Sequence, residues 1–186
     1  MAERFRCPWC EKDDLYRRYH DEEWGNPVFD DKIFFEFMIL EAFQAGLNWH
    51  TILKKRDGFR NAFDGFDVVK VSRYNEDRVE ELMSNSDVIR NRLKILAAIN
   101  NAKRFIEIQE EYGSFSNFIW SFVEGEPVVN FPKSSSDVPA TTELSDTIAG
   151  FLKKRGFKFM GSTVVYAFLQ ATGLVNDHLK TCWRSH

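Results

Sequence analysis

The chain has 186 residues, with 25 Lys and Arg against 28 Asp and Glu, and a formal net charge of −3. Hydrophobic residues make up 44% of it and 18 residues are Phe, a composition that excludes a disordered chain, a fibre and a linker. The longest apolar runs fall well short of the roughly 20 residues that cross a bilayer, and the N-terminus lacks the apolar core of a secretory signal. We expect a cytoplasmic, monomeric protein with no membrane partner.

Helix signals recur along the chain, whereas the alternation typical of strands never lasts. Capping residues precede most apolar segments and glycines follow several of them. The residues from 124 to 142 hold three of the five prolines and form the expected loop. The fold class is all-α. The expected helices are Asp30 or Asp31 to Gly46, Asn48 to Phe63, Asn75 to Met83, Val88 to Gly113, Ser116 to Val123, Glu143 to Gly156, Thr163 to Gly173, and a last turn from Asp177 to Trp183.

Three short runs of the sequence are strongly basic. A mild acidic excess argues against a nucleic-acid partner, because affinity for DNA comes from Lys and Arg that neutralise phosphates. Each run taken alone is typical of a solvated helix face, although together they would supply a local DNA face. The runs are Lys54, Lys55, Arg56 and Arg60; Arg90, Arg92, Lys94, Lys103 and Arg104; and Lys153, Lys154, Arg155 and Lys158.

Potential metal ligands lie near both ends of the chain. Cys7 and Cys10 form a C-x-x-C with His20 ten residues further on, and His178 and Cys182 lie four apart in a segment expected to be helical. Such side chains suit a tetrahedral zinc that joins the two ends, and a site of four protein ligands has no open position for chemistry. A buried, inert thiol is the alternative for Cys10. Because His50 and His186 are also available, the ligand set stays open at this point.

One carboxylate lies on an apolar helix face. Glu41 follows Phe34 by seven residues, Phe37 by four and Met38 by three, so all four share one side of the expected helix. Desolvation there raises the pKa of a carboxyl group, and such groups are enriched in functional sites. A buried Glu that pairs with an Arg is the alternative. Several Trp and Tyr residues lie nearby in the sequence. Their rings can stack on the flat heterocycle of a ligand, or they can pack in the hydrophobic core.

Six segments of the chain, taken together, resemble the bacterial 3-methyladenine DNA glycosylase I family of the helix-hairpin-helix superfamily. The resemblance covers nearly the whole chain, in order. It implies a helix-hairpin-helix glycosylase fold in which a zinc site joins the N- and C-terminal segments. The segments are Cys-Pro-Trp at 7–9, Tyr-His-Asp-Glu-Glu-Trp-Gly at 19–25, Leu-Glu-Ala-Phe-Gln-Ala-Gly-Leu-Asn-Trp at 40–49, Ile-Leu-Lys-Lys-Arg at 52–56, Lys-Lys-Arg-Gly-Phe-Lys-Phe-Met-Gly at 153–161 and Gly-Leu-Val-Asn-Asp-His at 173–178.

The resemblance also implies an organisation and a metal site. We expect one unit, 1–186, of two lobes: residues 1–30 with 140–186 form a zinc-stapled terminal lobe, and 31–139 form a helical lobe with the hairpin. Cys10 is not a family ligand, but it lies where it would compete for the metal. The ligands of one structural zinc per chain fall on Cys7, His20, His178 and Cys182.

The family's base pocket and DNA contacts map onto further residues. Glu41 takes the place of the base-recognising carboxylate, Tyr19 and Trp49 that of the stacking aromatics, and Trp9, Tyr16 and Trp24 that of other wall residues. Asp87 stands where the family's hairpin turn usually carries glycine; it would repel a phosphate, or cap the helix that follows. The expected DNA contacts are Gly46 and Leu47, which push into the base stack, and Arg90, Arg92 and Lys94 around the hairpin.

The implied reaction flips 3-methyladenine out of double-stranded alkylated DNA and hydrolyses its N-glycosidic bond, leaving an abasic site and free 3-methyladenine. The leaving base is already cationic, so it needs little acid catalysis, and the family has no catalytic Asp. A lyase would need a nucleophilic Lys beside the pocket, and the basic runs lie outside the pocket motifs. We therefore expect a monofunctional hydrolase. The alternatives are a non-catalytic relative that binds alkylated bases or DNA, and a zinc-stapled interaction module.

Overall fold

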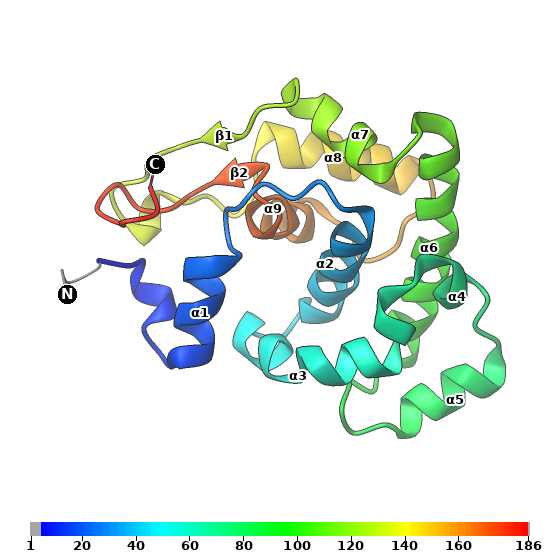
Figure 1. Cartoon of the computed structure of the whole chain (residues 1–186). Helices are drawn as coiled ribbons and strands as arrows, with labels where there is room; N and C mark the ends of the chain where they lie inside the picture. The colour runs from blue at the N-terminus through cyan, green and yellow to red at the C-terminus, as the bar shows by residue number, and fades with distance from the viewer. Residues whose placement is uncertain (1–4, 186) are drawn as a thin grey trace.

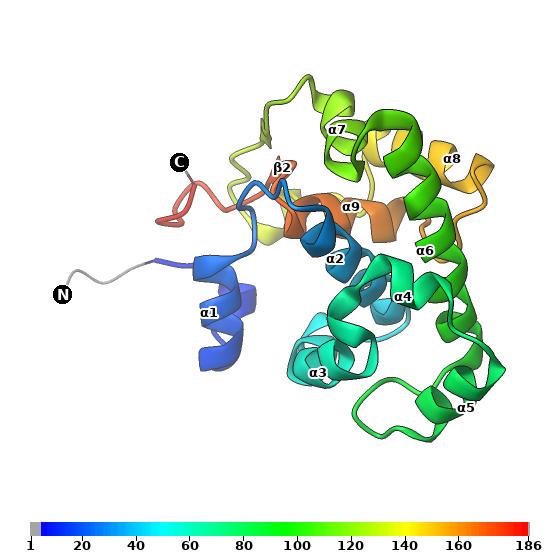
Figure 2. The ribbon, with the colours of Figure 1, turned by 45° about the vertical axis from the view of Figure 1, so that its right-hand side comes forward.

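Helix α2 (Asp31–Gln44) runs through the middle of the molecule and the other helices surround it, as the computed structural model of the chain shows (Figures 1 and 2). The structure describes residues 5–185. None of the described helices is long and apolar enough to cross a membrane. The remaining helices are α1 (Asp14–Glu22), α3 (Trp49–Ala62), α4 (Val68–Ser72), α5 (Glu76–Ser84), α6 (Arg92–Tyr112), α7 (Phe115–Trp120), α8 (Glu143–Lys154) and α9 (Ser162–Ala171), with 3-10 turns at Pro8–Cys10, Asp64–Phe66, Ser121–Val123 and Ser135–Asp137.

The predicted all-α class is confirmed, and capping side chains set most of the helix starts. The Asp30 carboxylate accepts hydrogen bonds from the first turn of α2, and the side chains of Asn48 and Asn75 do the same for α3 and α5. Gly113 ends α6 in the left-handed region, with φ of 83°, a conformation that costs glycine little. The local sequence therefore decides where these helices begin and end.

One predicted helix start was wrong by about four residues, and the starts of α7 and α9 were each wrong by one residue. Helix α6 begins at Arg92 rather than near Val88, because Asn91 provides the cap and accepts the Lys94 N–H. Helix α7 begins at Phe115, one residue before the predicted start. Asp87 caps neither helix; it is exposed in the hairpin between α5 and α6.

The predicted helical turn from Asp177 to Trp183 was also wrong. Residues 177–185 form turns without a helix, and they follow a short strand, β2 (Val175–Asn176), that pairs in parallel with β1 (Val128–Val129). The Lys180 N–H also donates to the Pro132 carbonyl, at 2.8 Å. The partners of this segment are thus backbone groups of the preceding loop, which the spacing of its own residues does not reveal.

Phenylalanine dominates the core. Among the described residues, the twelve largest fully buried side chains are eleven Phe and Met38, as expected from the excess of this residue type. One large cluster extends from Tyr19 to Val175 and includes side chains from both predicted lobes. A second, small cluster of Cys7, Leu179 and Cys182 joins the two ends of the chain, which lie on the same side of the molecule in Figure 1.

Candidate active site and metal cluster

A cavity of about 330 Å³ opens between the N-terminal segment, α2, the start of α3 and the C-terminal turns. It is wide enough for a planar heterocycle and is mostly apolar, as small-molecule sites usually are. Glu41 is the carboxylate that the sequence predicted to be functional, and it faces this cavity together with every aromatic residue predicted for the pocket. These lining residues are Trp9, Tyr16, Tyr19, Trp24, Glu41 and Trp49.

Glu41 is a buried carboxyl group without a protein partner. Its side chain is 3% exposed, and burial raises its pKa to about 8. No described residue donates a hydrogen bond to it, and the nearby Arg56 pairs with Glu36 and Glu23 instead. The alternative of a buried Glu–Arg pair is therefore excluded, and the carboxyl group stays available to a ligand.

Trp49 brings an unpaired donor to the same cavity. It is the first residue of α3, and its ring centroid lies 5.4 Å from that of Tyr19 and 6.3 Å from that of Phe37. Its buried Nε1–H has no hydrogen-bond partner among the described residues. A buried donor left unsatisfied costs about 1–3 kcal/mol, so the cavity holds both an acid and a donor that a polar ligand would satisfy.

Tyr16 is fixed from behind by a histidine. The His50 ring stacks on it with centroids 5.0 Å apart, and His50 Nε2 donates to the Asp13 carboxylate, which also accepts the Tyr16 N–H that begins α1. This contact fastens α1 to α3. His50, a candidate metal ligand on sequence grounds, is therefore committed to supporting Tyr16, which lines the cavity.

A tight turn follows α2 beside the cavity. Ala45 has φ −49° and ψ 118° and Gly46 has φ +81°, the angles of a type II turn, which favours glycine at its third position. The Leu47 N–H donates to the Gln44 carbonyl at 2.7 Å, and Gln44 Nε2 returns a bond to the Leu47 carbonyl at 2.9 Å. Gln44 also lines the cavity, while Leu47 is 41% exposed. The turn thus presents an apolar side chain next to the cavity mouth.

The three basic residues predicted to contact DNA lie in different environments. Arg90 is exposed, whereas the Arg92 guanidinium pairs with both Glu76 and Glu80. Lys94 is 7% exposed, so its ammonium does not lie on the surface where a phosphate would meet it. Acidic and carbonyl partners from other helices produce this difference, and the linear sequence does not show them.

The structure adds lining residues that the sequence reasoning missed. Gln44, Ser135, Val138 and Asp177 face the cavity with the aromatic residues. The buried Asp177 carboxylate accepts hydrogen bonds from Tyr166, Gln170 and Asn130. Ser135 and Val138 belong to the expected loop, and nothing in the sequence around them indicates a place in the cavity. The pairing of β1 with β2 is what brings this loop to the cavity.

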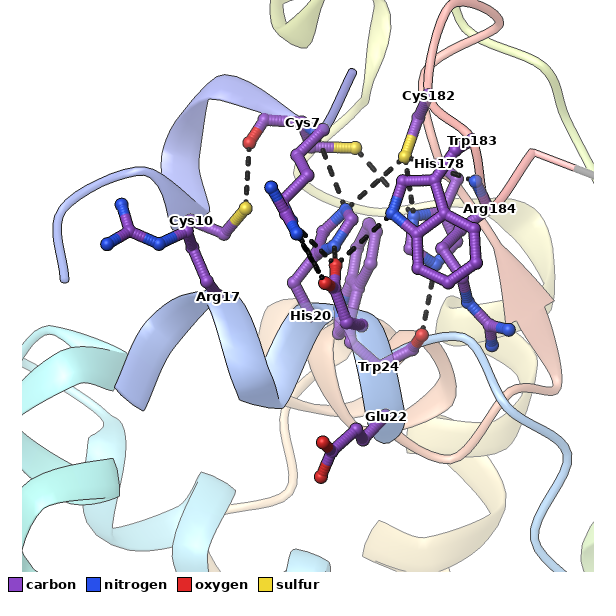
Figure 3. Close-up of polar contacts among 12 residues, drawn as sticks. Cys7, Cys10, Arg17, His20, Glu22, Trp24, His178, Cys182, Trp183 and Arg184 are labelled. Atoms are coloured by element: carbon purple, nitrogen blue, oxygen red, sulfur yellow. Dashed lines mark hydrogen bonds and ion pairs between the residues drawn. The ribbon is translucent and has the colours of Figure 1, made fainter. Parts of the chain in front are cut away.

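Four buried side chains gather where the two ends of the chain meet (Figure 3). They are the four predicted ligands Cys7, His20, His178 and Cys182, and their ligand atoms all lie within 4.8 Å of one another. The second nitrogen of each ring is occupied: His20 Nδ1 donates to Asp21 at 2.8 Å and His178 Nε2 donates to the Trp24 carbonyl at 3.0 Å. Such outer contacts orient histidine ligands, so His20 Nε2 and His178 Nδ1 face the cluster.

The electrostatics of the cluster suit a bound cation. Burial raises the pKa of Cys7 to about 12 and lowers that of His178 to about 4, so the protein alone stabilises neither a thiolate nor an imidazolium there. Two thiolates and two neutral imidazoles are the donor set of a closed, tetrahedral metal site. Cys10 lies outside this group, because its Sγ donates to the Cys7 carbonyl at 3.1 Å. His186 lies outside the described residues.

The metal cluster and the cavity share two aromatic walls. The Trp24 ring centroid lies 4.6 Å from that of His178, and the Trp9 centroid lies 5.4 Å from that of His20. The same two Trp side chains line the cavity. The cluster therefore supports one side of the cavity, and Cys7 is the cluster residue that also lines it.

Comparison with known proteins gives a consistent result. Residues 9–185 match the family model described as methyladenine glycosylase. The chain is 47% identical over 177 residues to DNA-3-methyladenine glycosylase 1 of Escherichia coli (strain K12), covering 95% of each protein. A crystal structure of 3-methyladenine DNA glycosylase I matches with a TM-score of 0.94 and 46% identity, over 97% of this chain and 99% of that one. A variant of such an enzyme in complex with 3-methyladenine matches with a TM-score of 0.92 and 37% identity, over 97% and 96%.

Proposed function

The chain belongs to the methyladenine glycosylase family and removes 3-methyladenine from DNA in DNA repair, and we propose that it does so in the cavity that holds Glu41. The observation that carries this assignment is a buried carboxyl group without a protein partner, enclosed by Trp and Tyr rings. In this proposal the flipped base packs against the Tyr19 and Trp49 rings rather than between them, because their centroids lie only 5.4 Å apart, and Trp9, Tyr16 and Trp24 complete the walls.

Selectivity for the lesion follows from its positive charge. Methylation at N3 makes the adenine of DNA cationic, and cations are attracted to the faces of aromatic rings. The incoming charge also favours the ionised form of Glu41, which then accepts hydrogen bonds from the base. Each base–aromatic stack contributes about 1–3 kcal/mol, which offsets the few kcal/mol that extrusion costs. Neutral adenine supplies no charge and leaves Glu41 protonated.

Hydrolysis breaks the bond between the sugar C1′ and the base. The electron pair of that bond goes to the cationic base, which leaves as neutral 3-methyladenine, and water adds to C1′ and releases a proton to solvent. None of the cavity-lining residues found within 5–185 is a lysine, so no amine is placed to attack the sugar. The proposed product is an abasic site, and the enzyme is monofunctional.

The remaining proposed partners are double-stranded DNA, which would meet the exposed turn beside the cavity, and a metal ion, which the four-residue cluster would hold. Gly46 and Leu47 would enter the stack that the lesion leaves in double-stranded DNA, with Arg90 near a phosphate. We propose that the protein acts in the cytoplasm and as a monomer. The four buried cluster residues would hold one structural zinc, which supplies no chemistry to the reaction and stabilises the junction of the two chain ends.

Base release is the direct test of the proposed function. Purified protein incubated with methylated duplex DNA should liberate free 3-methyladenine, detected by chromatography, and should leave abasic sites without cutting the strand. Strand cleavage in the absence of alkali would contradict the monofunctional mechanism. Binding of methylated DNA without base release would favour the non-catalytic alternative.

The unpaired indole N–H gives a second test. Trp49→Phe keeps an aromatic ring but removes the donor, so the affinity for free 3-methyladenine should fall at least fivefold, about the contribution of one hydrogen bond of 1 kcal/mol. Titration calorimetry measures this change. Trp9→Phe is the control, because it also trims a wall ring, but the Trp9 N–H is not among the buried, unpaired donors of residues 5–185. An equal loss in both variants would show that only ring area matters.

A further inference from the structure

The ammonium of Lys94 is buried at the C-terminal end of α2 without a carboxylate partner. Lys94 is the third residue of α6, and its Nζ donates to the Phe43 carbonyl at 2.8 Å and also to the Ala45 carbonyl. No ion pair joins it to any acidic residue within 5–185. A lysine is rarely buried unless it is paired with an acid, so its partners here call for an explanation.

The Phe43 and Ala45 carbonyls lie at the C-terminal end of α2, where backbone carbonyls lack partners within the helix. The last four C=O groups of an α-helix have no partner within the helix, and a cation there interacts favourably with the helix dipole. Water or a glycine cap would satisfy them without burying a charge. Here the protein instead buries an ammonium, which is costly to desolvate, and this ammonium holds two specific carbonyls in place.

One of these carbonyls belongs to the exposed turn itself. The Ala45–Gly46 peptide is the central peptide of the Gln44–Leu47 turn, and its orientation is what distinguishes type II from type I. A rotation of this one peptide plane would convert one turn type into the other and reverse the directions of the Ala45 carbonyl and the Gly46 N–H. Because Lys94 holds the Ala45 carbonyl, it favours the type II form with ψ of 118° at Ala45.

We infer that Lys94 is a positioning residue for the DNA step: it locks the turn so that Gly46 and Leu47 enter the duplex beside the cavity. The inference rests on the proposed function, in which this turn contacts DNA. Lys94 does not line the cavity and does not touch Glu41. Its effect should therefore fall on duplex substrate and spare the recognition of the free base.

The test compares Lys94→Met with Lys70→Met, which removes the same charge from an exposed position on α4. We expect Lys94→Met to slow single-turnover excision from methylated duplex at least tenfold, while its Kd for free 3-methyladenine changes less than twofold. Lys70→Met should leave both values unchanged, and Lys94→Arg should recover part of the rate. The Kd for the free base reports whether each variant is folded.

A double-mutant cycle with Gly46→Ala separates positioning from general stability. An alanine at this left-handed position disfavours the type II turn although nothing lies within 4 Å of its Cβ. If Lys94 acts through the turn, Gly46→Ala should slow excision strongly in the wild-type background and little in Lys94→Met. A normal excision rate in Lys94→Met, parallel losses of excision and free-base binding, or fully additive effects would each overturn the inference. Normal excision by Glu41→Gln would instead contradict the proposed function and leave this comparison intact.

Discussion

Glu41→Gln is expected to abolish most binding of 3-methyladenine and, at the same time, to stabilise the folded protein at and above neutral pH. The carboxyl pKa is about 8 in the folded protein against an ordinary value of 4.5. The folded state thus holds a proton that the unfolded state has lost, and stability that is present below pH 4.5 declines as the pH rises towards 8. At about 1.4 kcal/mol per pKa unit, the full shift corresponds to roughly 5 kcal/mol. The neutral amide of Gln avoids this cost, but it replaces one carboxylate oxygen by an NH2 donor and so accepts fewer hydrogen bonds from the base.

Melting temperatures measured from pH 5 to pH 9 test the stability part, and calorimetric titration with 3-methyladenine tests the binding part. The wild type should lose stability across this range relative to Glu41→Gln. Glu36→Gln is a matched control on the same helix: Glu36 is also buried, but it pairs with Arg56 and Arg60. Removing one partner of a buried ion pair costs about 3–5 kcal/mol, so this control should be destabilised. Equal melting curves for the wild type and Glu41→Gln would contradict an unpaired, desolvated carboxyl group.

Loss of the metal should unfold the junction between the chain ends. Cys182→Ser is expected to lower the metal content from the proposed one zinc per chain towards zero and the melting temperature by 10 °C or more. Apart from the ligands, the only buried hydrophobic residue of this cluster within 5–185 is Leu179, and the Trp9, Trp24 and Trp183 rings that pack against it are only partly buried. For a chain of this size each kcal/mol corresponds to about 2–4 °C, and structural zinc contributes several kcal/mol. Elemental analysis and thermal melting measure both effects, and a chelator should reproduce them in the wild type.

Cys10→Ser is the matched control for the metal site. Cys10 is as buried as the ligands but lies outside the cluster, and its thiol donates to the Cys7 carbonyl, a hydrogen bond that a hydroxyl also makes. Metal content should stay at one per chain in this variant. A full zinc complement in Cys182→Ser, or a loss of activity with an unchanged melting temperature, would contradict a stabilising role.

The sequence predicted the helices where the deciding interactions are local. Asp30, Asn48 and Asn75 each cap the helix that follows them, through bonds that span two or three residues. The same spacing argument was wrong for residues 177–185, which pair with a loop about 45 residues earlier. His178 and Cys182 still lie beside Cys7 and His20, because the tertiary fold, rather than helical spacing, places these four side chains.

The sequence by itself determined the residue types of the pocket and of the metal site, since aromatic rings, one carboxylate and two Cys–His pairs are visible as motifs. Only the tertiary structure decided which charges have partners. Arg56 and Arg92 are paired with acids from other segments, Lys94 holds backbone carbonyls, and Glu41 has no partner within residues 5–185. The reason is physical: caps and helical periodicity act over a few residues, whereas the pairing and desolvation of a charge depend on groups that folding brings from distant parts of the chain.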